Sequence, residues 1–125
     1  MNLYHLSPVN HNGKTFYPRI PKTAATGEDL LTPRVCFAPT IKQAVIAINP
    51  AGDFMSEYEY FVHVPVNCNN VHIPTEMEVP DVDDTEEVWV TEPVKLACIG
   101  KVIVRYGMSS SDFEVIELQC KQIKF

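Results

Sequence analysis

The chain contains no long apolar run. None of its stretches approaches the roughly 18 residues that a membrane-spanning helix requires. The N-terminal segment MNLYHLSPVN lacks the basic residues and the apolar stretch of a secretory signal peptide. We therefore expect the protein to stay in the cytoplasm of the cell that makes it.

Positive charge is also scarce. Ten Lys and Arg residues face 16 Asp and Glu residues, so that the formal net charge is -6 and the pI about 5.1. A nucleic acid or an anionic membrane normally meets a basic face, and this balance counts against both partners. Hydrophobic residues make up 46% and charged residues 21% of the sequence, as in globular proteins. A length of 125 residues predicts a single domain, residues 1–125.

No CxxC pair and no metal-ligand spacing of histidines occurs. The cysteines are Cys36, Cys68, Cys98 and Cys120, and the histidines are His5, His11, His63 and His72. We expect all four cysteines to be reduced and mostly structural, and we expect no metal site. Cys36 and Cys98 fall inside apolar strand-like runs, which predicts that both are buried free thiols.

The first third of the chain predicts two strands around a long loop. Asn2–Leu6 is a short apolar run that Pro8 should end. Asn10–Leu31 is rich in Pro, Gly, Lys and Thr without periodicity, which is typical of a loop. Arg34–Ala38 is the second predicted strand, and Pro39 should end it.

One helix is predicted, over Thr40–Ile48. Thr40 is a typical N-cap residue, and the apolar residues that follow recur at helical spacing. These residues are Ile41, Ala44, Val45 and Ile48. Asn49–Gly52 should end the helix.

Glu57–Val66 is the clearest strand, because its residues alternate between two faces. The first face carries Tyr58, Tyr60, Val62 and Val64, and the second carries Glu57, Glu59, Phe61 and His63. We expect His63 to be a half-exposed strand residue rather than a catalyst. Asn67–Asp84, which follows, is acidic and has no regular pattern.

The last third predicts antiparallel strands at Val88–Val90 and Leu96–Val104, with Pro93 at the corner between them. Phe113–Leu118 and Gln122–Phe125 supply one or two closing strands. The predicted fold is α+β: a β-rich core of split antiparallel sheets with one main helix.

Glu86 and Glu87 lead directly into the Val88–Val90 strand, which would hold a carboxylate at the mouth of a rigid element. The alternative is that the two acids only keep a sheet edge soluble, since charges on loops are usually solvated. Either way, we expect Glu87 to be partly exposed.

The order of these elements resembles the ADP-ribosyltransferase fold. The resemblance is to its histidine-containing branch, which includes poly(ADP-ribose) polymerases and diphtheria-like toxins. In that branch the first strand ends in a histidine, as Leu3-Tyr4-His5 does here, and I-Y-F-A before a helix is similar to Val35-Cys36-Phe37-Ala38. The late strand pair N-E-Y-I-V-Y-D-P resembles Glu86–Pro93. These segments touch about half of the chain.

The opening L-Y-H-L-S-P also looks like small phage-encoded relatives of the fold, which ADP-ribosylate bacterial defence proteins. This resemblance implies a phage-encoded effector that works in bacterial or host-cell cytoplasm. It implies NAD as the substrate and a protein as the acceptor.

The resemblance also implies roles for named residues. Glu87 would stabilise the positive charge that builds up on the ribose when nicotinamide leaves, as carboxylates do in glycoside chemistry. His5 would bond the ribose of the adenosine half, and the backbone of Leu6 would bond the nicotinamide amide. Ser7 belongs to the same NAD-binding segment.

Two features depart from the family pattern. Leu6 stands where the family usually has glycine, which narrows the pocket. The helix tyrosine that stacks on nicotinamide is missing, because Val45 or Ile46 occupies its place. An aromatic side chain elsewhere could replace it: Phe37, Tyr17 or Tyr60.

Arg19 and Arg34 could clamp a pyrophosphate, because guanidinium matches phosphate oxygens. The alternative for both is an ordinary surface ion pair with the acidic loop.

Two main functions therefore remain open. The first is an NAD-dependent mono-ADP-ribosyltransferase that modifies a protein. The second is a non-enzymatic module of the same fold, with a degraded pocket and an acidic surface that binds a partner protein. An enzyme requires that His5 and Glu87 face one cleft. A third function, an NAD-using enzyme acting on RNA ends or phosphates, is disfavoured because a polynucleotide needs a basic face.

Overall fold

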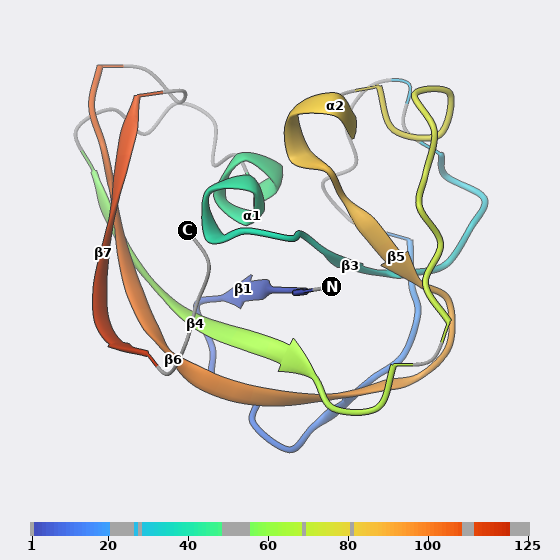
Figure 1. Ribbon diagram of the computed structural model, residues 1–125, viewed down its shortest axis with the longest axis horizontal. Coiled ribbons are helices and arrows are strands. Elements are labelled where there is room, and N and C mark those ends of the chain that lie inside the picture. Colours follow the sequence, from blue (N-terminus) through green and yellow to red (C-terminus); the bar gives the residue numbers. More distant parts are fainter. Residues whose placement is uncertain are drawn as a thin grey trace.

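The computed structural model describes residues 2–20, 27, 29–48, 56–68, 70–80, 82–108 and 112–120, with the side chains of residues 117–120 left aside. These residues form an α+β protein, rich in antiparallel strands and with few helices (Figure 1). The elements are β1 (His5–Ser7), β2 (Thr15–Phe16), β3 (Val35–Phe37), α1 (Ile41–Ile48), β4 (Glu57–Pro65), α2 (Val82–Thr85), β5 (Val88–Val90), β6 (Val94–Tyr106) and β7 (Phe113–Cys120).

The larger sheet has the strand order β1-β4-β6-β2, and β7 pairs with β6. Its central pair joins β4 to β6 in antiparallel register from Glu57–Arg105 to Pro65–Leu96, so that the two clearest predicted strands are neighbours. In Figure 1, β6 follows the outer curve of the molecule from beneath β5 to β7. This one long strand therefore pairs with three others, β2, β4 and β7.

The smaller sheet pairs β3 with β5, and Cys36 lies opposite Trp89 in it. A single bridge between Tyr4 and Ala38 joins the start of β1 to the end of β3. This bridge brings the two sheets together at the N-terminal strand.

Helix α1 starts as its sequence predicts. The Thr40 hydroxyl accepts a hydrogen bond from the Gln43 amide at 3.2 Å, as an N-cap should. The buried face of the helix packs against β1, β4 and β6 of the larger sheet. This core contains Tyr4, Leu6, Ala38, Ile41, Ala44, Val45, Tyr60, Val62, Val102, Val104 and Tyr106.

A second core lies between the smaller sheet and the start of β6. It contains Leu3, Val35, Phe37, Val88, Val90, Val94 and Leu96. Because strand side chains alternate, the opposite face of the β3–β5 sheet carries the side chains of Arg34, Cys36, Glu87 and Trp89. The apolar core thus fixes the sheet on which these four residues stand.

Several predicted boundaries were wrong. The first strand begins at His5 rather than Asn2. From His5 on, the chain pairs with β4, whereas Tyr4 pairs with Ala38 at the end of β3. The loop at Asn10–Leu31 contains β2, which adds an edge strand to β6. The irregular acidic segment ends in the short helix α2.

The last predicted strand, Gln122–Phe125, and the predicted helix end at Asn49–Gly52 lie outside the described residues. In the part of the chain that the structure describes, no helix has both the length and the apolar character needed to cross a membrane.

Candidate functional site

Strands β1 and β3 separate directly after their single bridge. The amide of Tyr4 donates to the carbonyl of Ala38 at 2.8 Å, and the Ala38 amide donates back at 3.0 Å. In a regular antiparallel ladder the next such pair would join Leu6 to Cys36. The Cys36 carbonyl instead meets Nδ1 of His5, at 3.1 Å. The His5 side chain therefore occupies the point where the two strands fork.

The predicted catalytic acid is at the other side of β3. The Glu87 carboxylate accepts a hydrogen bond from Nε1 of Trp89 at 3.2 Å and contacts the thiol of Cys36. The Glu87 amide donates to the Thr85 hydroxyl at 3.3 Å, which fixes the backbone before β5. Only 8% of Glu87 is exposed, so the expectation of a partly exposed acid was wrong. The indole and the thiol replace the water that would solvate an exposed carboxylate.

His5 and Glu87 thus converge on one residue, Cys36. His5 contacts the backbone carbonyl of Cys36 at the edge of β3, and Glu87 contacts the thiol of Cys36 on the face of β3. Burial, and then the negative charge of Glu87, raise the pKa of the Cys36 thiol, which therefore stays protonated and can donate to the carboxylate.

The prediction of buried free thiols was right about the thiols and wrong about burial. Cys36 and Cys98 are free, but both are only half-buried. Cys36 lies on the face of β3 opposite the second core, and neither cysteine belongs to the fully buried residues of the two cores.

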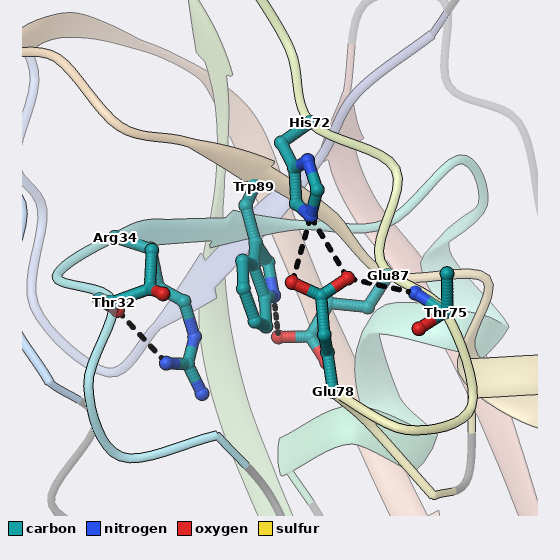
Figure 2. Close-up of polar contacts among 7 residues, drawn as sticks. All are labelled: Thr32, Arg34, His72, Thr75, Glu78, Glu87 and Trp89. Atoms are coloured by element: carbon teal, nitrogen blue, oxygen red, sulfur yellow. Dashed lines mark hydrogen bonds and ion pairs between the residues drawn. The ribbon is translucent and has the colours of Figure 1, made fainter.

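Arg34 is buried rather than paired at the surface (Figure 2). Its guanidinium carbon lies 4.0 Å from the centre of the Trp89 ring, and Nη1 donates to the carbonyls of Asp29 at 2.8 Å and Thr32 at 2.9 Å. The surface ion pair was therefore the wrong alternative for Arg34, which is 2% exposed. Its backbone pairs with that of Arg19, whose side chain is exposed. The pyrophosphate clamp stays a prediction.

The His72 ring lies against the same tryptophan, and Glu78 contacts His72 (Figure 2). The backbone of His72 pairs with that of Trp89 through two hydrogen bonds of 2.8 Å. Nε2 of His72 is 3.0 Å from both carboxylate oxygens of Glu78, which also accepts from the Thr75 amide at 3.1 Å. A continuous line of contacts therefore runs from Glu78 through His72 and Trp89 to Glu87.

The His5 ring lies among other rings. Its centre is 5.6 Å from that of Phe16, 6.0 Å from Phe37 and 6.2 Å from His63. Burial lowers the pKa of His5, which favours the neutral imidazole. A neutral ring that donates from Nδ1 to the Cys36 carbonyl has an unprotonated Nε2. That atom could accept a hydrogen bond from a ribose hydroxyl.

His63 was predicted to be half-exposed and is fully buried. The alternation itself holds, because Tyr58, Tyr60, Val62 and Val64 all face the core beneath α1 and His63 lies on the opposite face. That face is covered by the segment that contains His11, whose ring centre lies 5.5 Å from that of His63. Nδ1 of His63 donates to the His5 carbonyl at 3.2 Å, and Nε2 accepts from the His11 amide at 2.9 Å. His63 therefore holds the backbone of His5 in place. A period-2 pattern alone does not reveal this role.

His63 makes stability depend on pH. Burial lowers its pKa from 6.5 to about 4, and His5 and His11, whose pKa values are also lowered, face it. Between these two pH values the unfolded chain takes up the proton and the folded chain does not. Stability should therefore be complete above pH 6.5 and fall by up to about 3 kcal/mol as the pH drops towards 4. Urea unfolding at pH 7.5, 6.0 and 5.0 measures the loss.

The matched controls for this dependence are His63→Gln and His72→Gln. The first should make the decline in stability between pH 6.5 and 5 less steep, because it removes one of the three histidines whose pKa values are lowered. The second alters an exposed histidine and should leave the slope unchanged. Equal slopes in all three proteins would contradict the assignment to His63.

Leu6 and Ser7 follow His5 into the larger sheet. The Leu6 side chain is buried in the core beneath α1, so that its backbone alone could meet a ligand at the fork. The Ser7 hydroxyl lies 3.0 Å from Nε2 of His11 and accepts from the Val9 amide at 3.2 Å. The predicted NAD-binding roles of both residues stay predictions.

The three aromatic candidates for nicotinamide stacking differ in exposure. Tyr60 is buried in the core beneath α1, and Phe37 is buried in the second core. Tyr17 is 69% exposed, and its neighbour Phe16 touches the His5 ring. Tyr17 is thus the one of the three whose ring faces are open to a ligand.

No group of His, Cys, Asp and Glu side chains within the described ranges could hold a metal ion. A surface hollow lined by Glu57, Arg105, Asp112 and their neighbours lies between the ends of β4, β6 and β7. It contains none of the predicted site residues. The chain matches no family model, and no curated protein or solved structure matches it significantly. Any function must therefore be argued from the residues themselves.

Proposed function

We propose that this chain is an NAD-dependent mono-ADP-ribosyltransferase with an ADP-ribosyltransferase-like fold that modifies a protein. The observation that supports the proposal is that His5 and Glu87 both contact Cys36 beside the point where β1 separates from β3, His5 at the backbone carbonyl and Glu87 at the thiol on the other side of the strand. They lie about 80 residues apart in the chain, so their meeting at one residue is a property of the fold. A single cleft that both side chains face, which an enzyme requires, stays a prediction.

The roles proposed for these residues agree with their hydrogen bonds. A neutral His5 with Nδ1 on the Cys36 carbonyl would present Nε2 as an acceptor to a ribose hydroxyl of the adenosine half. Glu87, fixed by Trp89, would stand near the other ribose. A carboxylate held by such contacts needs little reorganisation when positive charge develops at C1′.

In the proposed reaction the bond between C1′ and the nicotinamide nitrogen breaks, and nicotinamide leaves with the bonding electrons. A nucleophile of the acceptor protein forms the new bond to C1′ and gives up its proton to solvent. Glu87 is neither consumed nor protonated overall. It stabilises the oxocarbenium-like state between the two steps.

A second candidate is the non-enzymatic module of the same fold. It is favoured by the burial of Glu87, whose carboxylate already has the Trp89 indole and the Cys36 thiol as partners. Buried Phe37 and Tyr60 support it as well, because neither could stack on nicotinamide where it lies.

NAD binding separates the two candidates. We expect NAD to raise the melting temperature of the protein in a saturable way, and labelled NAD to transfer label to a protein in a bacterial lysate. His5→Ala should weaken NAD binding roughly tenfold, the effect of one lost hydrogen bond. Met108→Ala, at an exposed residue near the end of β6 and away from the candidate site, is the control and should bind NAD normally. If the wild-type protein neither binds NAD nor labels any protein, the binding module is the function.

A further inference from the structure

Large apolar side chains are exposed on two loops beside the β3–β5 sheet. These residues are Leu30, Leu31, Val71, Ile73 and Met77. Leu31 is 90% exposed and Met77 is 91% exposed. We call residues 29–32 and 71–78 together the docking loops. Soluble proteins rarely gather such side chains without a reason, and a group of them with a polar rim is typical of an interaction surface.

The docking loops are held against one another. The Asp29 amide donates to the Glu78 carbonyl at 2.7 Å, and the Glu78 amide donates to the Thr75 carbonyl at 3.0 Å. The Leu31 amide donates to the Asp29 carboxylate at 2.7 Å, which fixes the turn that carries Leu30 and Leu31. Each exposed apolar residue lies within two positions of this network or of the His72–Glu78 pair. The apolar surface is thus presented by an ordered backbone.

The full charges on the docking loops are all negative: Asp29, Glu76 and Glu78. Asp83 of α2 forms a side-chain hydrogen bond to Glu76. This hydrogen bond, and then the negative charge of Asp83, raise the pKa of Glu76. The nearest guanidinium, that of Arg34, is buried beneath the loops and donates to their carbonyls. A partner with apolar side chains flanked by lysine or arginine complements this surface in shape and sign.

The docking loops also lie directly over the candidate site. Glu78 contacts His72, the His72 ring lies 5.3 Å from that of Trp89, and Trp89 donates to Glu87 (Figure 2). A polypeptide bound here would therefore lie beside β5, the strand that Glu87 directly precedes. This is where an acceptor protein has to be held.

We propose that the docking loops bind a basic, apolar segment of the acceptor protein. The proposal rests on the proposed transferase function only where it identifies the bound protein as the acceptor of ADP-ribose. The same surface would bind the partner of a non-enzymatic module. What it adds is the chemical class of the segment and the residues that meet it.

The test uses the intact protein and two synthetic peptides, one alternating leucine with lysine and one alternating leucine with glutamate. We expect the lysine peptide to bind in the micromolar range, to shift the amide resonances of residues 29–32 and 71–78, and to bind at least tenfold more tightly than the glutamate peptide. Neither result requires NAD. A failure of peptide binding can therefore be distinguished from a failure of NAD binding.

Two exposed methionines supply matched variants. Met77→Lys changes the docking loops and Met108→Lys makes the same change at a residue that is 77% exposed, near the end of β6. The first should weaken binding of the lysine peptide roughly tenfold, and the second should have less than a twofold effect. Unchanged melting temperatures establish that both variants are folded.

Equal weakening by the two variants would overturn the proposal, because it would show only attraction to an acidic protein. Binding of both peptides with the same affinity would overturn the role of charge. Self-association of the protein that Met77→Lys abolishes would instead assign the docking loops to a second copy of the chain.

Discussion

If the chain is the proposed transferase, Glu87→Gln should reduce turnover by a factor of roughly a hundred or more and leave NAD affinity nearly unchanged. Glutamine keeps the volume and an oxygen that can accept from Trp89, but it lacks the charge that the developing oxocarbenium ion needs. Deleting one electrostatic stabiliser from a preorganised site has effects of this size. Initial rates of labelling and the NAD dissociation constant, measured on the same preparation, test both parts.

The variant should also be less stable, by about 1–3 kcal/mol. Glu87 is buried against Trp89 and the Cys36 thiol, and hydrogen bonds to a buried charged group contribute about this much. The loss in turnover must therefore be measured well below the melting temperature of the variant. A fall in turnover that follows the loss of folded protein would argue for a purely structural role of Glu87.

Glu86→Gln is the matched control. Glu86 is the adjacent acid, but it is exposed, has a positive φ of 49°, and accepts a hydrogen bond from Gln43 Nε2 at 2.7 Å. Its carboxylate therefore points to α1 and not to the face that carries Cys36. Turnover should stay within about twofold of the wild type, since surface changes seldom matter. Equal losses from both variants would mean that the catalytic acid has been misassigned.

Trp89→Ala should destabilise the protein by about 3–5 kcal/mol, the range for removing a large side chain from a core. Trp89 is fully buried, and the Arg34 guanidinium, the His72 ring and the Glu87 carboxylate all contact it. Its removal would leave two buried charged groups without their common partner. Chemical denaturation at pH 7.5 measures the change in the free energy of unfolding.

Two further substitutions make this result specific. Trp89→Phe keeps an aromatic face for Arg34 but loses the indole donor to Glu87, so that it should cost less than Trp89→Ala and still lower turnover. Leu31→Ala removes an apolar side chain that is almost wholly exposed and should change stability by less than about 0.5 kcal/mol. A cost below about 1 kcal/mol for Trp89→Ala would contradict the packing described for this residue.

Local patterns predicted the fold class and most of the elements. The period-2 run at Glu57–Val66 became β4, the spacing after Thr40 became α1, and Pro93 lies at the corner between β5 and β6. Each of these depends on interactions within a few residues, such as capping, alternation or a missing amide donor, and the sequence carries such information directly.

The sequence by itself pointed to Glu87 through its place before a strand, and the resemblance to ADP-ribosyltransferases pointed to His5 together with Glu87. The sequence could not place them on opposite sides of Cys36, nor bury Glu87 against Trp89, because those contacts join segments far apart in the chain. The burial of His63 depended on the segment around His11, which covers its face of β4 and donates a hydrogen bond to its Nε2. The ordered docking loops depended on a hydrogen bond between Asp29 and Glu78. Only the tertiary structure decided these features, since long-range pairing sets register, burial and the partners of charged groups.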